Sequence, residues 1–261
     1  MPVLLTETRA AVLTLTLNRP EVRNALSWEL REALREAFET ARDDEDVRVV
    51  VLTGAGKAFC SGLDLGELGA IQTRSSEENL ADSVALAALF KLIYTFPKPV
   101  IAAVNGHALA GGAGLASVCD LTIMSDAAKL GYTEARIGFV AALVGVFLVR
   151  QVSEKAARDL LLSARLVTAQ EALGMGLVNE VRPPDEVLPR AFEFAQSLRA
   201  NSPTSLALTK RLLATVPSLG LDEGLSYATN LNALSRTTAD LAEGVAAFLE
   251  KRAPAWAEDG E

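Results

Sequence analysis

The chain has 261 residues, of which half are hydrophobic and 22% are charged, a balance typical of a globular rather than a disordered protein. Its formal net charge of −8 argues against a nucleic-acid partner, because a nucleic-acid-binding surface needs a concentrated basic patch. Two cysteines and one histidine indicate neither a disulfide framework nor a Cys- or His-based metal site, so we expect no metal.

No apolar stretch approaches the roughly 20 residues that are needed to cross a bilayer, so we expect no membrane partner. The N-terminus shows neither the basic start of a secretion signal nor the composition of a transit peptide. The last residues, 258–261, match no peroxisomal or retention address. We therefore expect a cytoplasmic protein.

The first part of the chain alternates between strand-like and helix-like segments. Residues 12–17 alternate between apolar and polar with period two and lead into a turn, which predicts a strand. Ser27 is a good cap for a helix that runs to about Ala41. Residues 47–53 form a β-branched run that ends at glycines, which is typical of a buried strand.

The same alternation continues beyond these segments. A helix is predicted over 75–94, because Ser75 and Glu78 have the spacing of a capping box. Buried strands are predicted at 100–104 and 121–124, with a glycine-rich turn and a short helix between them. Strands that return after each helix favour a largely parallel sheet covered on both faces, which is an α/β fold.

After Pro183-Pro184 the pattern changes. Residues 185–252 are almost wholly helical in pattern, with breaks at 201–203 and 217–220. We therefore expect an α/β core at residues 1–200 and a helical region at residues 201–261.

Two segments that follow predicted strands are candidates for a functional site, 57–65 and 105–114. The carboxyl ends of parallel strands meet at one edge of the sheet, where α/β proteins usually bind ligands. Small residues there let the backbone approach a ligand closely, and a helix that starts near Gly111 adds unpaired N–H groups. Two N–H groups that converge on one oxygen form an oxyanion hole, worth about 3–4 kcal/mol per donor.

The glycines of residues 105–114 could equally serve only to permit tight turns. They do not form a dinucleotide-binding fingerprint, because the third glycine of that motif is absent. They do not form a P-loop either, because no Lys-Ser/Thr follows them. The glycines alone therefore leave the function open.

Short motifs are spread along nearly the whole chain. They are Asn18-Arg19-Pro20, Arg23-Asn24-Ala25-Leu26, Ala58-Phe59-Cys60-Ser61-Gly62-Leu63-Asp64-Leu65, Ala103-Val104-Asn105-Gly106, Gly111-Gly112, Cys119-Asp120, Thr133-Glu134 and Ala247-Phe248-Leu249-Glu250-Lys251-Arg252. Each is weak alone, but together, and in this order, they are highly specific. The chain resembles the crotonase (enoyl-CoA hydratase/isomerase) superfamily.

The resemblance implies a spiral core of repeated ββα units and a C-terminal helical region that forms a homotrimer or a hexamer of two stacked trimers. It implies an acyl-coenzyme A thioester as substrate, and no separate cofactor, since coenzyme A is part of the substrate. It places the catalytic oxyanion donors at the N–H groups of Ser61 and Gly111, where they would stabilise an enolate.

The resemblance also implies a set of positions that bind coenzyme A. Those along one chain's own ligand are Arg23 near the phosphates, Ala25, Ala58, Ser61, Gly62, Leu63, Asp64, Leu65 and Gly111. Phe248 and Lys251 would reach the nucleotide end of a neighbouring subunit's ligand. Without the motifs, Arg23 and Lys251 would be interpreted as solvated surface charges.

The catalytic carboxylates separate the reactions of this family, and the chain departs from the two-carboxylate hydratase pattern. Gly114 occupies the position of the first glutamate, whereas the second glutamate, twenty residues later (134 − 114 = 20), is retained as Glu134. The Pro-Gly that usually follows it is replaced by Ala141-Ala142 in an apolar stretch, which would raise the pKa of Glu134 towards the range useful for proton transfer. The alternative for Glu134 is an exposed loop residue.

Other reactive side chains are assigned structural roles. Cys60 has no neighbouring base, Cys119 is expected in the core, and His107 is expected to be structural. Asp64 and Glu67 are the nearest substitutes for the missing carboxylate. We expect Asp64 to cap the helix that follows it and Glu67 to be solvated.

The sequence therefore predicts an enzyme that acts on an enoyl-CoA thioester. Double-bond isomerisation is favoured, because one glutamate can remove a proton from one carbon and return it to another. A hydratase that works with Glu134 as its main carboxylate is one alternative, and a CoA-binding protein without turnover is the other. The length and branching of the acyl chain depend on pocket walls that we expect from residues 68–92 and 139–147.

Overall fold

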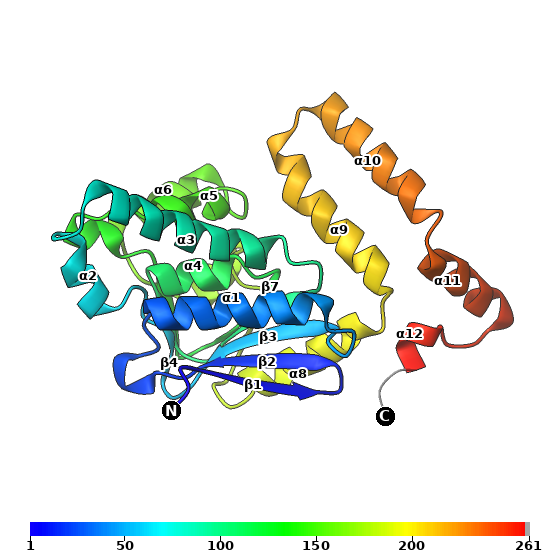
Figure 1. Cartoon of the computed structure of the whole chain (residues 1–261), viewed down its shortest axis with the longest axis horizontal. Helices are drawn as coiled ribbons and strands as arrows, with labels where there is room; N and C mark the ends of the chain where they lie inside the picture. The colour runs from blue at the N-terminus through cyan, green and yellow to red at the C-terminus, as the bar shows by residue number, and fades with distance from the viewer. Residues whose placement is uncertain (259–261) are drawn as a thin grey trace.

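The chain folds around two β-sheets (Figure 1). The computed structural model describes residues 1–258, so residues 259–261 of the C-terminal segment considered above lie outside the described residues. Within that range the first sheet has six strands and the second has four. In spatial order, the first sheet contains β1 Leu4–Arg9, β2 Val12–Leu17, β3 Val49–Gly54, β5 Val100–Val104, β7 Leu121–Ser125 and β10 Glu180–Arg182. The second contains β4 Ala58–Cys60, β6 His107–Leu109, β8 Lys129–Gly131 and β9 Val167–Thr168.

Three pairs of consecutive strands, β3/β4, β5/β6 and β7/β8, each contribute one strand to the first sheet and one to the second. Helices follow each pair. Strands β3, β5 and β7 pair in parallel in the first sheet, and β4, β6 and β8 pair in parallel in the second. The predicted α/β class and the ββα repeat are therefore confirmed. The sequence pattern predicted only one sheet, because strands of two or three residues are too short to show a periodicity.

Helices α1 (Trp28–Asp43) and α3 (Ser76–Tyr94) begin at the predicted caps. The Ser27 hydroxyl accepts a hydrogen bond from the Leu30 N–H at the start of α1. Ser75 and Glu78 form a capping box at the start of α3. The remaining helices of this part are η1 Pro20–Val22, α2 Leu65–Ile71, α4 Gly111–Ser117, η2 Glu134–Ile137, α5 Ala142–Leu148, α6 Glu154–Ser163, α7 Ala169–Met175 and α8 Val187–Arg199.

Both faces of the six-stranded sheet are covered, because successive residues of a strand point to opposite sides. Val50 and Leu52 of β3 belong to the larger hydrophobic cluster, which includes Leu34 of α1. Val49 of the same strand belongs to a second cluster with Ala191 of α8. The six-stranded sheet is thus packed on both faces, whereas the candidate loops follow the short strands of the second sheet.

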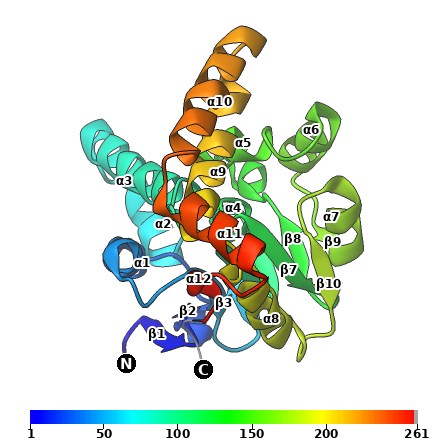
Figure 2. The same cartoon turned by 90° about the vertical axis from the view of Figure 1, so that its right-hand side faces the viewer.

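The C-terminal helices extend away from the sheets in both views (Figures 1 and 2). Lys210 attaches them to the core, since its ammonium group donates to the Lys98 carbonyl at 2.9 Å and pairs with Asp120. Further along, Arg48 of the core donates to the Trp256 carbonyl at 3.3 Å. The helices are α9 Pro203–Thr215, η3 Val216–Ser218, α10 Leu221–Ser235, α11 Ala239–Glu250 and α12 Ala255–Glu258. That residue 200 separates two domains stays a prediction.

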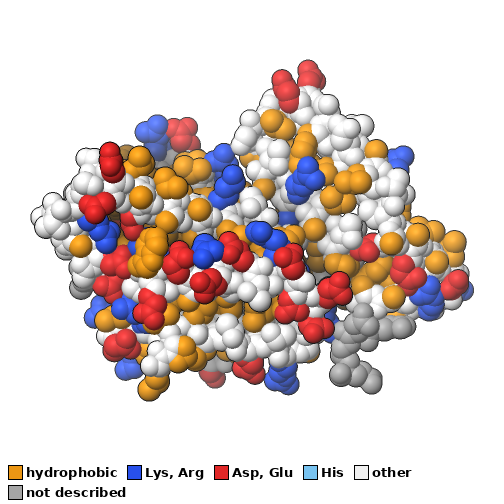
Figure 3. Space-filling model, viewed as in Figure 1, with side chains coloured by type: hydrophobic (Ala, Val, Ile, Leu, Met, Phe, Trp, Pro, Cys, Tyr) orange, Lys and Arg blue, Asp and Glu red, His pale blue; other side chains and the backbone are white. Residues whose placement is uncertain are grey.

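Hydrophobic side chains are exposed on these C-terminal helices (Figure 3). Phe248 is 83% exposed and Leu221 is 79% exposed. Other exposed hydrophobic residues on these helices include Leu213, Leu225, Leu234, Leu241, Val245 and Leu249. Apolar surface of this extent is typical of an interaction site. In the part of the chain that is described, no helix is long and apolar enough to span a membrane.

Candidate functional site

The two predicted loops meet backbone to backbone at the ends of the neighbouring strands β4 and β6. Gly62 has a positive φ of 92°, and a Cβ there would lie 2.9 Å from Ala110 Cβ and 3.2 Å from Gly111 N. A Cβ on Gly112 would lie 2.2 Å from the Cys60 carbonyl oxygen. Glycine is required at both positions so that the loops can approach each other.

The N–H group of Ser61 is not available to a ligand, because it donates to the Arg23 carbonyl at 3.0 Å. The prediction that Ser61 provides an oxyanion donor is therefore wrong. The N–H of Leu63 has no acceptor among residues 1–258. The residues on either side of it are both hydrogen-bonded to Leu26: the Gly62 carbonyl accepts from the Leu26 N–H, and the Asp64 N–H donates to the Leu26 carbonyl. A Cβ on Gly111 would lie 3.9 Å from Leu63 N, so the backbone of Leu63 is close to that of Gly111. Leu63 therefore replaces Ser61 as the candidate partner of Gly111 in the oxyanion hole.

Gly111 is the first residue of α4, so its N–H group has no partner within the helix. The preceding residue, Ala110, has a positive φ of 50° and donates its own N–H to the Gly131 carbonyl at 2.7 Å. A non-glycine residue rarely adopts this conformation, and here it turns the chain sharply between β6 and α4. The geometry supports Gly111 as an oxyanion donor, a role that stays a prediction.

Glu134 begins the 3₁₀ turn η2, three residues after Gly131. Its side chain is buried, with 8% exposed, so it is not the exposed loop glutamate considered as the alternative. Its Oε2 atom is buried without a hydrogen-bond partner among the described residues. Burial raises the pKa of Glu134 above the usual carboxyl value, against a smaller lowering effect of its own backbone N–H. A buried carboxyl group with a raised pKa is suited to proton transfer.

Hydrophobic side chains occupy the space beside Gly114, where a hydratase would carry its first glutamate. A Cβ on Gly114 would lie 2.1 Å from Val144 Cγ1 and 3.3 Å from Phe90 Cε2. Phe90 is wholly buried and Val144 is 4% exposed. The carboxylate is therefore absent, and its place is filled by packed apolar groups.

Asp64 and Glu67 are both engaged in ion pairs and are not substitutes for that carboxylate. Asp64 caps α2, as predicted, and lies 2.9 Å from Arg19. Its burial opposes ionisation, but hydrogen bonds from Gly66 and Arg19 lower the pKa of Asp64 overall. Glu67 pairs with Arg31 at 2.6 Å, so the prediction that Glu67 is solvated is wrong.

Several predicted CoA-binding positions lie together around the loop after β4. Leu26 pairs with Leu63, which brings the 19–26 turn against this loop. Arg23 is exposed on that turn in the left-handed conformation, whereas Ala25 and Ala58 are buried. Leu65 starts α2, and its side chain is outside the described parts of the chain.

Phe248 and Lys251 lie on or just after α11, at the opposite end of the molecule from α2 and β4 (Figure 1). Within one chain they are therefore separated from the other predicted binding residues. This separation agrees with a contact to a neighbouring subunit's ligand, which stays a prediction.

The cysteines and the histidine have structural environments. Burial raises the pKa of Cys60 to about 12, and burial also raises the pKa of Cys119. A thiol with a raised pKa is a poor nucleophile. The Nδ1 atom of His107 accepts a hydrogen bond from the Lys129 N–H at 3.1 Å.

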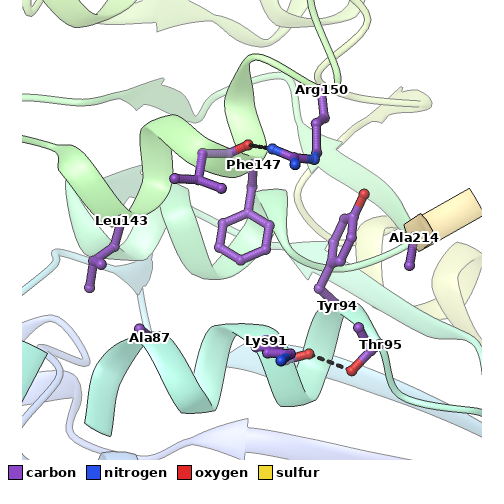
Figure 4. A pocket seen from close by; sticks show the side chains of 9 residues that line it. Ala87, Lys91, Tyr94, Thr95, Leu143, Phe147, Arg150 and Ala214 are labelled. Atoms are coloured by element: carbon purple, nitrogen blue, oxygen red, sulfur yellow. Dashed lines mark hydrogen bonds between the residues drawn. The ribbon is translucent and has the colours of Figure 1, made fainter. Parts of the chain in front are cut away.

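A cavity of about 360 Å³ lies between α3, α5 and α9 (Figure 4). Tyr94 and Phe147 project into it, and Lys91 and Arg150 bring positive charge to its edge. Its lining also includes Ala87 and Leu143, which lie in the two segments predicted as pocket walls. That these segments enclose the acyl chain stays a prediction. The lining of the cavity within residues 1–258 includes no carboxylate, so we do not place the chemistry there.

The chain matches known proteins over nearly its whole length. The family model for enoyl-CoA hydratase/isomerase matches residues 7–259. A Thermus thermophilus protein provisionally named enoyl-CoA hydratase is 53% identical over 243 residues, which cover 93% of this chain and 96% of that protein. The 2,3-dehydroadipyl-CoA hydratase of Escherichia coli is 36% identical over 257 residues, which cover 97% of this chain and 98% of that protein.

Solved structures agree with these sequence matches. The crystal structure of an enoyl-CoA hydratase from Mycobacterium smegmatis has a TM-score of 0.92 and 36% sequence identity, and covers 98% of this chain and 99% of that one. The fold, the loop geometry and the matches lead to one conclusion. The chain belongs to the enoyl-CoA hydratase/isomerase family, the crotonase superfamily that its motifs predicted.

Proposed function

We propose that this enzyme moves the double bond of an enoyl-CoA thioester, with Glu134 as its only catalytic carboxylate. The observation that carries the proposal is the environment of Gly114. Val144 and Phe90 fill the space of the first hydratase glutamate, while the second glutamate is kept and buried. An isomerase needs one group that carries a proton between two carbons, whereas two-carboxylate hydration needs a second group for water.

In the proposed mechanism, the thioester oxygen accepts hydrogen bonds from the N–H groups of Leu63 and Gly111. Glu134 removes a proton from C2 of a trans-3-enoyl-CoA, and the electron pair of that C–H bond delocalises into a dienolate. The two N–H groups stabilise the negative charge that develops on oxygen. Glu134 then returns the proton to C4, which gives the trans-2-enoyl-CoA.

The test is to assay the purified enzyme with trans-3-enoyl-CoA and trans-2-enoyl-CoA side by side. We expect kcat/KM for isomerisation to exceed that for hydration. Hydration much faster than isomerisation would contradict the proposal and favour a hydratase with Glu134 as its main carboxylate. The names of several relatives, such as the 2,3-dehydroadipyl-CoA hydratase, favour that second candidate. A panel of thioesters would then define the acyl chain.

Replacing Gly111 by Val should disable one oxyanion donor without unfolding the protein. A Cβ at this position meets Leu26 Cδ1 at 3.4 Å and Leu63 N at 3.9 Å, which are ordinary contacts. The side chain would cover the site of the thioester oxygen, so we expect kcat/KM to fall a few hundred-fold. This corresponds to a loss of about 3 kcal/mol of transition-state stabilisation. His107→Ala is the control and should keep its activity. A folded Gly111→Val enzyme with near-normal turnover would contradict the assignment.

We also expect the chain to form a trimer, stacked into a hexamer. The exposed side chains of Leu221, Leu225 and Phe248 would then be buried against other copies. In that assembly Phe248 and Lys251 would reach a neighbouring subunit's ligand. Light scattering checks the assembly, and a monomer at micromolar concentration would contradict it.

A further inference from the structure

Tyr132 is a buried residue two positions before Glu134, and the proposed mechanism does not use it. Its side chain is 1% exposed. Its phenol oxygen lies 2.6 Å from the Oγ atom of Ser117, the last residue of α4. Ser117 is itself 5% exposed, so water does not compete for this hydrogen bond.

The direction of this hydrogen bond follows from the count of hydroxyl protons. The Ser117 hydroxyl has one proton and donates it to the Ala113 carbonyl at 2.8 Å. The phenol of Tyr132 is therefore the donor to Ser117. Burial raises the pKa of Tyr132, its hydrogen bond with Ser117 lowers it and the charge of Glu134 raises it, with a net increase. The phenol thus keeps its proton at neutral pH.

Two hydrogen bonds attach the segment that carries Glu134 to the helix that carries Gly111. At the start of α4, the Ala110 N–H donates to the Gly131 carbonyl at 2.7 Å. At its last residue, Ser117 accepts from Tyr132. Gly131 and Tyr132 are consecutive, so this short piece of chain is bonded to both ends of α4.

We infer that Tyr132 is a positioning residue, which acts through Ser117 to set the Glu134 carboxylate against the Gly111 N–H group. The inference rests on the proposed role of Glu134, although it holds for isomerisation and for hydration. A misplacement of about 1 Å between reacting groups can cost a hundred-fold in rate. Since Ala110 and Gly131 retain the other attachment, we expect the loss of this one to cost about tenfold.

The test is Tyr132→Phe, which removes the phenol O–H and keeps the ring in the core. We expect kcat to fall by about tenfold while KM stays within about two-fold, because substrate contacts are unchanged. Ser117→Ala should have the same effect, and the double variant should be no slower than either single variant. Tyr227→Phe is the matched control, since the Tyr227 phenol accepts a hydrogen bond from Arg211 at 2.9 Å outside the site.

Two results would overturn the inference. One is a Tyr132→Phe enzyme whose kcat stays within two-fold of the wild type, whether or not its KM increases. The other is a double variant whose loss is the product of the single losses, which would mean that Tyr132 and Ser117 act independently. The Glu134→Gln variant distinguishes failure of the positioning role from failure of the proposed function. If Glu134→Gln is inactive and Tyr132→Phe is normal, only the positioning role fails, whereas an active Glu134→Gln enzyme refutes the function itself.

Discussion

Glu134→Gln is expected to lower kcat by roughly a thousand-fold, because general acid–base groups contribute about 10²–10⁴ to the rate. The amide has nearly the shape of the carboxyl group but cannot carry the proton. CoA affinity, measured by calorimetry, should be unchanged, since the proposed mechanism uses Glu134 at the reacting carbons and not along the nucleotide. Unchanged turnover would mean that another group moves the proton.

Glu67→Gln is the informative comparison for this variant. Glu67 is one of the two alternative carboxylates, with Asp64, but it is paired with the buried guanidinium of Arg31 at 2.6 Å. We expect its replacement to lower the melting temperature while kcat remains close to that of the wild type. A collapse of kcat in Glu67→Gln, with the fold intact, would instead favour a hydratase that recruits this residue.

The raised pKa of Glu134 also predicts an effect on stability. Because the pKa in the folded state is above that in the unfolded state, the stabilising contribution is fully present below the unfolded pKa and is lost as pH rises through the folded pKa. At neutral pH the buried charge therefore destabilises the fold. Glu134→Gln should melt at a higher temperature than the wild type at pH 7, and the difference should shrink towards pH 4.

Gly114→Glu, which restores the missing hydratase glutamate, is expected to destabilise the protein rather than make it a hydratase. The new Cβ would lie 2.1 Å from Val144 Cγ1, and its carboxylate would be placed among apolar groups. Overpacking and an unpaired buried charge together should cost at least about 3 kcal/mol. For a domain of this size that corresponds to roughly 6–12 °C in Tm, measurable by calorimetry.

A second substitution tests whether Val144 is the cause. Val144→Ala alone should destabilise the fold by roughly 2 kcal/mol, because it leaves a small cavity. In the Gly114→Glu background it should instead recover stability, since it removes the clash, and the two changes should be non-additive by at least about 1 kcal/mol. Val146→Ala, on the same helix but half-exposed, is the matched control and should be additive. Additivity of Val144→Ala would contradict the steric account.

The sequence predicted the long periodic elements well. Residues 12–17 and 100–104 coincide with β2 and β5, and the capping box at Ser75 marks the start of α3. The short strands were missed because three residues carry too little pattern to distinguish a strand from a loop. Only the resemblance implied the ββα repeat that they form.

The sequence identified two of the proposed site residues, but it did not identify which N–H group lies beside that of Gly111. Gly111 and Glu134 were identified by their register in the motifs, and the structure brings their segments together. Ser61 and Leu63 are two residues apart in one loop, and sequence alone does not distinguish them. What separates them is the hydrogen bond from Ser61 to Arg23, a contact between distant segments. Val144 was missed for the same reason, because its contact with Gly114 spans thirty residues (144 − 114 = 30).

The central claim is that one carboxylate carries the proton from C2 to C4 of the bound thioester. It is tested most directly with trans-3-enoyl-CoA deuterated at C2, in a single turnover in ordinary water. Since Glu134 is buried, exchange of its deuteron with solvent should compete poorly with its return to carbon. We therefore expect deuterium at C4 of the trans-2-enoyl-CoA product. A product without deuterium at C4 would contradict it.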